Sequence, residues 1–190
     1  KNQIPTQEIE KYLKVVESEV KRCQTIAKSF LDVSKKDYKH TPVNINTILE
    51  TMVCFFKDNP IAKNITFECK FDSKVPVILA SAQHLQQVFI NLFMNAIEAM
   101  DKKGTITITT RNQSDKLIIK ISDTGSGMPP EVLEKIFNPF FTTKTEKSTG
   151  IGLTISKKII EAHKGEIYAE SQQGKGSTFT ISLPVKSKNA

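Results

Sequence analysis

Apolar residues recur at three- and four-residue intervals through the first part of the chain. The recurring positions are Ile9, Leu13, Val16, Val20, Cys23, Ala27 and Phe30. This spacing is the seam of a heptad repeat, and no Gly or Pro interrupts the chain between Thr6 and Asp37. The pattern predicts one long helix within residues 1–40. Its apolar stripe would pack in a bundle, with another helix of this chain or with a second copy, and packing on the following domain is the alternative.

The pattern changes after a polar break at Asp37–Pro42. Helical spacing predicts helices over Thr47–Lys57, Ala82–Met100 and Thr154–Ala162. Alternation of apolar and polar residues predicts strands near 65–71, 106–108, 117–121, 167–169 and 177–183. For residues 41–190 we therefore expect an α+β fold, a two-layer α/β sandwich whose sheet is mixed but mostly antiparallel. Its helices would lie on one face of the sheet, and the long bundle-forming helix would precede it.

The segment of about residues 124–149 fits neither pattern. It is rich in Gly, Pro, Thr and Lys, and loops of this length in compact domains are usually functional lids or disordered. Its apolar residues, Ile136, Phe137, Phe140 and Phe141, indicate that part of it docks on apolar surface. We expect a lid here, anchored by the three phenylalanines.

Composition narrows the class of protein. The 190 residues are 38% hydrophobic and 25% charged, a mixture typical of soluble globular domains. No apolar run is long enough to span a membrane, and Lys1–Gln7 does not resemble a signal peptide, so we expect no membrane contact by this segment. Three widely separated cysteines indicate a reducing, cytoplasmic location. The net charge of +7 favours anionic partners, with a merely basic soluble surface as the alternative.

A row of amides marks one face of the helix predicted over 82–100. Gln87, Asn91 and Asn95 are spaced four residues apart and share that face. An amide oxygen is a hard ligand suited to Mg²⁺, and an amide N–H can donate to phosphate. Taken alone, an exposed polar face explains the row equally well.

A carboxylate follows the strand predicted over 117–121. Asp123-Thr-Gly125-Ser-Gly127 places two glycines behind it, where the backbone can approach a flat ligand closely. The same letters resemble the active-site turn of an aspartic protease, which would have to be a dimer because only one such turn is present.

Glycines also open the helix predicted near residue 154. In Ser148-Thr149-Gly150-Ile151-Gly152-Leu153, backbone N–H groups at a helix start could bind phosphate. The sequence contains no P-loop and no GxGxxG after a strand, so neither a P-loop nucleotide site nor a dinucleotide-binding fold is supported.

Each motif alone is weak evidence, but their order along the chain is typical of one protein family. From Pro42 to about Pro184, the amide helix, Asp123-x-Gly125-x-Gly127, Phe137–Lys144, Gly150-x-Gly152 and Gly174-x-Gly176 follow one another. In this order the chain resembles the ATP-binding domain of a sensor histidine kinase, within the ATPase superfamily shared with gyrase, mismatch-repair ATPases and a heat-shock chaperone. Residues 1–40 resemble the second helix of that family's dimerisation and phosphotransfer hairpin.

The resemblance implies roles for ATP and Mg²⁺ binding. Asn95 would ligate Mg²⁺ through its side-chain oxygen, and Asn91 would support the ion or the phosphates. Asp123 would accept a hydrogen bond from the adenine amine, and Thr178 would join it through water. Lys144 would reach the γ-phosphate and, with Asn91, act in catalysis. The remaining ATP-binding positions that the resemblance implies are Gly125, Gly127, Met128, Thr149, Gly150, Ile151, Gly152 and Leu153.

Two positions depart from the family pattern. Ser148 stands where many relatives have Gly. None of His40, His84 and His163 is followed by an acidic residue and, five positions on, by proline, as the family's phospho-accepting histidine is. We therefore expect the acceptor helix to precede Lys1 and this fragment not to phosphorylate itself.

The function expected is that of an ATP:protein-histidine phosphotransferase core in two-component signal transduction. Asn91 stands where hydrolytic members of the superfamily carry a glutamate, and an amide cannot act as a general base, which favours transfer over hydrolysis. Alternatives are a non-catalytic ATP-binding regulatory module and, remotely, a dimeric aspartic protease. The partners expected are a response regulator and, where the hairpin is complete, a second copy through the N-terminal helix. No nucleic-acid partner is expected.

Overall fold

The computed structural model describes residues 40–101, 103–143 and 149–185, together with Leu13, Val16, Glu17 and Val20. The chain divides into two compact units, Lys1–Lys36 and Asp37–Ala190. In the first unit the described residues are helical, and the side chains of Leu13, Val16 and Val20 are exposed. The rest of the predicted heptad seam lies outside the described residues.

The second unit is built on a sheet of five strands in the order β2-β4-β5-β7-β6. The strands are β2 (Asn64–Phe71), β4 (Lys103–Gln113), β5 (Lys116–Asp123), β6 (Glu166–Gln172) and β7 (Gly176–Pro184). β2 and β4 run parallel, and the other neighbours are antiparallel. The chain reaches β4 from β2 through a helix, as parallel pairing requires. A separate small sheet pairs β1 (Thr41–Val43) with β3 (Ile78–Ala80).

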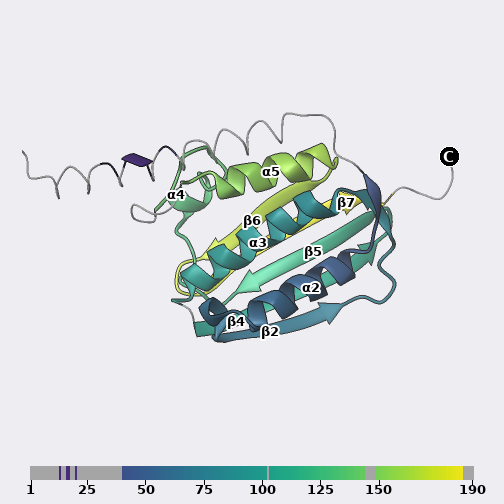
Figure 1. Ribbon diagram of the computed structural model, residues 1–190, viewed down its shortest axis with the longest axis horizontal. Coiled ribbons are helices and arrows are strands. Elements are labelled where there is room, and N and C mark those ends of the chain that lie inside the picture. The colour runs from purple at the N-terminus through teal and green to yellow at the C-terminus, as the bar shows by residue number, and fades with distance from the viewer. Residues whose placement is uncertain are drawn as a thin grey trace, which may run out of the picture. The chain divides into compact units, whose positions relative to one another are not determined.

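Three helices cover one face of the five-stranded sheet (Figure 1). They are α2 (Ile45–Lys57), α3 (Ala82–Ala99) and α5 (Gly152–Ala162), and η1 (Pro60–Ala62) and α4 (Pro130–Leu133) are short turns. In α3, Phe93 is fully buried, and its ring meets Phe56 of α2 edge-on at 5.5 Å and Phe67 of β2 at 5.9 Å. Burial of such rings is a large hydrophobic contribution, so α3 is fixed firmly against both α2 and the sheet.

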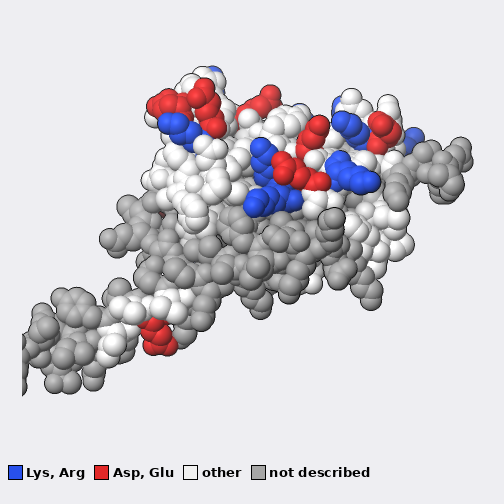
Figure 2. All heavy atoms as spheres, turned by 90° about the horizontal axis from the view of Figure 1, so that it is seen from above, with Lys and Arg blue, Asp and Glu red and all other residues white. Residues whose placement is uncertain are grey.

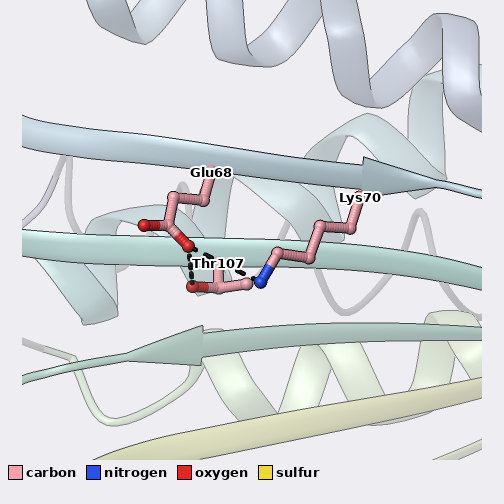
Figure 3. A network of polar contacts seen from close by, with 3 residues as sticks. All are labelled: Glu68, Lys70 and Thr107. Carbon is pink, nitrogen blue, oxygen red and sulfur yellow. Dashed lines mark hydrogen bonds and ion pairs between the residues drawn. The ribbon is translucent and has the colours of Figure 1, made fainter.

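The other face of the sheet carries polar side chains. Figure 3 shows one group of them on β2 and β4: Oε2 of Glu68 lies 3.8 Å from Nζ of Lys70 and accepts a hydrogen bond from Oγ1 of Thr107 at 3.4 Å. Half or more of the Glu68 and Lys70 side chains is exposed, so this ion pair adds little stability. The alternation predicted from the sequence thus separates an apolar core face from a polar one.

The predicted fold class is confirmed, with differences at the ends of elements. α2 begins at Ile45 because the side chain of Asn44 accepts the N–H of Asn46 at 2.9 Å. Ser81 holds the N-cap position of α3, but its hydroxyl bonds Nδ1 of His84 at 2.6 Å instead of capping an N–H. The segment of residues 124–149, expected to contain no helix or strand, contains the short helix α4. Pro130 is its first residue, a position that suits proline.

Charges of both signs lie interspersed on the face drawn in Figure 2. Among the residues coloured there, no extended strip of one sign forms on that face, unlike the continuous basic track that follows a nucleic-acid backbone. In the described part of the chain, none of the helices combines the length and apolarity that a membrane crossing needs.

Candidate functional site

A cavity of about 530 Å³ lies beside the carboxyl end of β5. Its walls come from α3, the end of β5, the segment around α4, the start of α5 and β7. Many of the predicted site residues line it: Asn91, Asn95, Asp123, Gly127, Met128, Thr149, Gly150, Gly152 and Leu153. The fold therefore brings the amide helix, the carboxylate turn and the glycine turn to one place.

Asp123 ends β5 at one wall of the cavity and is buried. Its Oδ1 accepts the backbone N–H of Gly125 at 2.8 Å and that of Ser177 at 3.3 Å. Burial raises the pKa of the Asp123 carboxyl above its ordinary value, and these two N–H groups oppose the rise. No hydrogen bond to Oδ2 is formed within the described part of the chain, so that oxygen is available to a donor in the cavity.

The turn after Asp123 is pressed against the β6–β7 hairpin. Gly127 has φ +64°, and a Cβ there would collide with the carbonyl of Gln172. The N–H of Gly174 donates to the carbonyl of Ser126 at 2.6 Å. Gly125 lies behind the wall, where a Cβ would come within 2.7 Å of the Ala99 carbonyl. Both predicted glycines are thus required by close backbone packing.

Asn91 and Asn95 reach the cavity from α3, opposite the start of α5. Nδ2 of Asn91 donates to Oγ of the buried Ser156 at 3.0 Å. A Cβ at Gly152 would collide with Oδ1 of Asn91, so glycine is what lets the two helices approach here. The carboxylate of Glu98, one turn beyond Asn95, also lines the cavity.

The glycine turn before α5 contacts the segment that follows α4. Gly150 has φ +64°, and its Cα faces the backbone of Phe140 and Phe141. Oγ1 of Thr154 donates to the carbonyl of Phe137 at 3.1 Å. Ile151 occupies the N-cap position of α5, and its side chain is buried in the core rather than in the cavity wall.

Two of the four apolar residues expected to dock the segment of residues 124–149 line the cavity. Ile136 is buried and lines the cavity, and Phe141 lines it as well. Phe140 is 67% exposed, so the expectation that it anchors the segment is wrong. Lys144 and Ser148 lie outside the described residues, and the role of Lys144 stays a prediction.

Thr178 does not reach the cavity. Its hydroxyl lies 2.9 Å from that of Ser122, on the opposite face of the sheet from Asp123. The neighbouring Ser177 lines the cavity instead, because successive side chains of a strand point to opposite faces. The signal was present in the sequence: Phe179, Ile181 and Leu183 form the apolar face of β7, and Ser177 continues it.

Comparisons with known proteins agree with this geometry. Residues 80–187 match the model of a family described as histidine kinase-, DNA gyrase B-, and HSP90-like ATPase. Sporulation kinase C of Bacillus subtilis is 38% identical over 93% of this chain, and sensor histidine kinase ZraS of Salmonella typhi is 35% identical over 90%. The chain spans 41% and 37% of these two relatives.

Solved structures agree as well. The catalytic domain of histidine kinase ThkA has a TM-score of 0.70 and 35% identity, covering 77% of this chain and 95% of that domain. ThkA in complex with the response regulator protein TrrA has a TM-score of 0.72 and 31% identity, covering all of this chain and 55% of the other. The protease alternative receives no support from these matches. Cavity, fold and sequence together show that the chain belongs to the family of histidine kinase-, DNA gyrase B- and HSP90-like ATPases, as an ATPase domain of the sensor histidine kinase type.

Proposed function

We propose that this chain binds MgATP in the cavity and positions its γ-phosphoryl group for transfer to a histidine of a two-component sensor kinase. The observation that carries the proposal is the convergence of Asp123, Asn91, Asn95 and Gly150 on one cavity in a domain of this family. The cavity volume of about 530 Å³ falls in the range of small-molecule sites.

Adenine would lie at the end of the cavity formed by Asp123, Gly127 and Met128. The free Oδ2 of Asp123 would accept the exocyclic amine, a charge-assisted hydrogen bond in a partly desolvated place. The side chain of Met128 would contact the flat face of the base, since a thioether packs well against aromatic rings. Thr178 is placed by its Ser122 contact where it could act on this end only indirectly.

The phosphates would extend toward α3 and α5. Backbone N–H groups at Gly150 and Gly152, at the start of α5, would donate to them where the helix dipole favours negative charge. Thr149 and Leu153 flank this turn in the cavity wall. Lys144 is proposed to reach the γ-phosphate, where its charge would offset charge that develops during transfer.

The donor set of the cavity fits magnesium bound with a nucleotide. Mg²⁺ in nucleotide sites usually keeps water and takes one or two protein oxygens together with phosphate oxygens. Oδ1 of Asn95 would be the protein ligand, and Asn91, held by Ser156, would stand beside it. The ion would neutralise phosphate charge, while Asn95 and Asn91 fix the orientation of the triphosphate.

The acceptor histidine is proposed to lie outside the three that this chain contains. His163 ends α5, about 16 Å along the helix from Gly152 at a rise of about 1.5 Å per residue. Both of its ring nitrogens are engaged, with the N–H of Ser81 and the carbonyl of Ile159. His40 lies against it, with ring centroids 5.1 Å apart. His163, His40 and His84 are all absent from the cavity wall, which supports an acceptor histidine supplied from elsewhere.

Partners and location follow from the family and remain part of the proposal. A response regulator would receive the phosphoryl group, as the ThkA–TrrA complex shows such a kinase bound to one. Dimerisation is assigned to the N-terminal helix, where Leu13, Val16 and Val20 are exposed at seam spacing. The reaction would take place in the cytoplasm.

The test is phosphoryl transfer from γ-labelled ATP to a separately supplied acceptor hairpin of a sensor histidine kinase. We expect label on the hairpin that is lost in acid and kept in base, the behaviour of phosphohistidine. ATP binding without transfer would favour the non-catalytic module. Release of free phosphate alone would favour hydrolysis. Glu98 is the cavity carboxylate on α3, one turn from Asn95, and Glu98→Gln would then abolish the hydrolysis.

A further inference from the structure

Ser171 of β6 lies behind the cavity wall and joins the turn after Asp123 to the β6–β7 hairpin. Its Oγ accepts the backbone N–H of Met128 at 2.8 Å and donates to the carbonyl of Gly176 at 2.9 Å. It also lies 3.0 Å from Oγ of Ser177, which lines the cavity. One hydroxyl therefore contacts both sides of the site at which a base is proposed to bind.

The number of protons fixes the direction of the Ser171–Ser177 hydrogen bond. A serine hydroxyl has one hydrogen and two acceptor lone pairs. The carbonyl of Gly176 can only accept, so the hydroxyl of Ser171 must donate its one hydrogen to that carbonyl. Without this donation, two oxygens would lie 2.9 Å apart with no hydrogen between them. Ser177 is therefore the donor to Ser171, and the hydroxyl of Ser171 is saturated.

The polarity of the cavity follows from this direction. The hydrogen of Ser177 points toward Ser171, so only acceptor lone pairs of its hydroxyl remain for the cavity. Oδ2 of Asp123 is also an acceptor, and Oδ1 is already occupied by N–H groups from Gly125 and Ser177. The two residues adjoin, because the N–H of Ser177 bonds Asp123, and both line the cavity. Acceptors from adjoining residues favour a ligand amine and disfavour a carbonyl oxygen.

We infer that Ser171 is a positioning residue for base selectivity: by accepting the Ser177 proton, it makes the base end of the cavity accept an exocyclic amine and reject a carbonyl in the same place. The inference rests on the proposed function, because it concerns the base end of the proposed ATP site. Ser171 acts through Ser177 and does not itself line the cavity.

The test compares ATP with inosine triphosphate, in which a carbonyl replaces the exocyclic amine and N1 carries a hydrogen. Affinities of the 190-residue chain for both are measured by calorimetry. In Ser171→Ala the Ser177 hydroxyl is free to turn and donate, so we expect the preference for ATP over inosine triphosphate to fall about tenfold, the scale of one hydrogen bond. Ser171→Thr keeps the hydroxyl on an edge strand that tolerates β-branching, and should retain the preference.

Two further variants separate a role in selectivity from general damage. Ser122→Ala removes the matched hydroxyl pair with Thr178 on the outer face and should leave the preference unchanged. In a double-mutant cycle, Ser171→Ala should have no further effect on the preference in a Ser177→Ala background, because both act through one hydroxyl. If Ser171→Ala fails to fold, Ser177→Ala alone should still weaken ATP binding and spare inosine triphosphate.

An unchanged preference in Ser171→Ala, or equal and additive effects of the two serine variants, would overturn the inference while leaving ATP binding intact. Failure of the unmodified chain to bind ATP would instead overturn the proposed function itself. The two failures are therefore distinguished by the unmodified chain.

Discussion

The two ends of the cavity are built in different ways. The base end is made of strand ends and tight turns whose backbone groups are already bonded: Asp123 holds two N–H groups, and Ser171 closes the hairpin against Met128. The phosphate end is made of two helices, α3 and α5, in contact through Asn91, Ser156 and Gly152. The base end is thus held by backbone groups of strands and turns, whereas the phosphate end is held by side chains where two helices pack.

Variants at the two ends of the cavity should therefore change ligand affinities in different ways. Damage at the base end should weaken adenosine and its triphosphate alike. Damage at the phosphate end should weaken triphosphates with magnesium and spare adenosine. The variants below test that separation, in order of expected effect.

The largest effect is expected from Gly127→Ala. The substitution puts a Cβ into the carbonyl of Gln172 and also requires an L-residue at φ +64°, so the turn must move. We expect adenosine and ATP affinities each to fall by more than about a hundredfold, equivalent to more than about 2.7 kcal/mol. Calorimetry with both ligands measures this.

Gly174→Ala is the matched control for Gly127→Ala. Gly174 also has positive φ, +78°, but no atom lies within 4 Å of a Cβ built there. Only conformational strain of about 1–2 kcal/mol is expected, seen in thermal unfolding and not in affinity. Equal effects of the two variants on binding would show that close packing does not form the base end.

Asp123→Asn should weaken adenosine and ATP to the same extent, by about ten- to a hundredfold, because an amide can present a donor where the adenine amine needs an acceptor. It should not destabilise the unliganded domain. Burial raises the folded-state pKa of Asp123 above 3.8, so the neutral form stabilises the fold at low pH and that contribution is lost as pH rises through the folded pKa. The amide stays neutral throughout.

Chemical denaturation from pH 3 to pH 7 therefore provides a second measurement for Asp123→Asn. Relative to the variant, the unmodified chain should lose stability as pH rises through this range. A variant that bound adenosine normally but lost ATP would place Asp123 at the phosphate end and would contradict the division between the two ends.

Asn95→Ala should act at the phosphate end alone. Removal of one oxygen ligand should weaken magnesium-dependent ATP binding by about tenfold and leave adenosine unchanged. Gln87→Ala is the control: it lies on the same face of α3 two turns earlier and does not line the cavity. An equal loss of adenosine and ATP in Asn95→Ala would make Asn95 a structural residue.

The sequence predicted elements and motifs well because each depends on local spacing. The sheet, the three covering helices and the cavity-lining Asp123, Asn91 and Gly152 all follow from periodicity and from glycine and amide positions. The resemblance pointed to Thr178, whereas the two-residue alternation of β7 turns Ser177 toward the cavity. The two positions are one residue apart, so their side chains lie on opposite faces of the sheet.

Other features could not be predicted because they depend on contacts distant in the sequence. Ser156 and Asn91 meet only when α3 and α5 pack, and Ser171 meets Met128 only when the hairpin closes on the turn. Phe140 is apolar, which favoured an anchoring role, yet a left-handed φ of +65° in a tight turn leaves its side chain exposed. Apolar character predicts burial on average, not at each position.

The smallest effect is expected at the far end of α5, where His163 tests whether the cavity is insulated from the rest of that helix. Burial lowers the pKa of His163 below 6.5, and His40 and His84 lower it further, while the bond to the Ile159 carbonyl opposes them. Nε2 accepts the N–H of Ser81 at 2.9 Å, which only the neutral ring can do.

Because the folded pKa of His163 is depressed, the contribution of His163 to stability is fully present above about pH 6.5 and is lost as pH falls toward the folded pKa. His163→Gln keeps one acceptor and one donor without titrating, so between pH 5 and pH 7 its unfolding free energy should vary less with pH than that of the unmodified chain. Adenosine affinity should be the same in both proteins at pH 7. If the pH dependence persisted in His163→Gln, His163 would not be the titrating group. A change in adenosine affinity would show that the two ends of α5 are coupled.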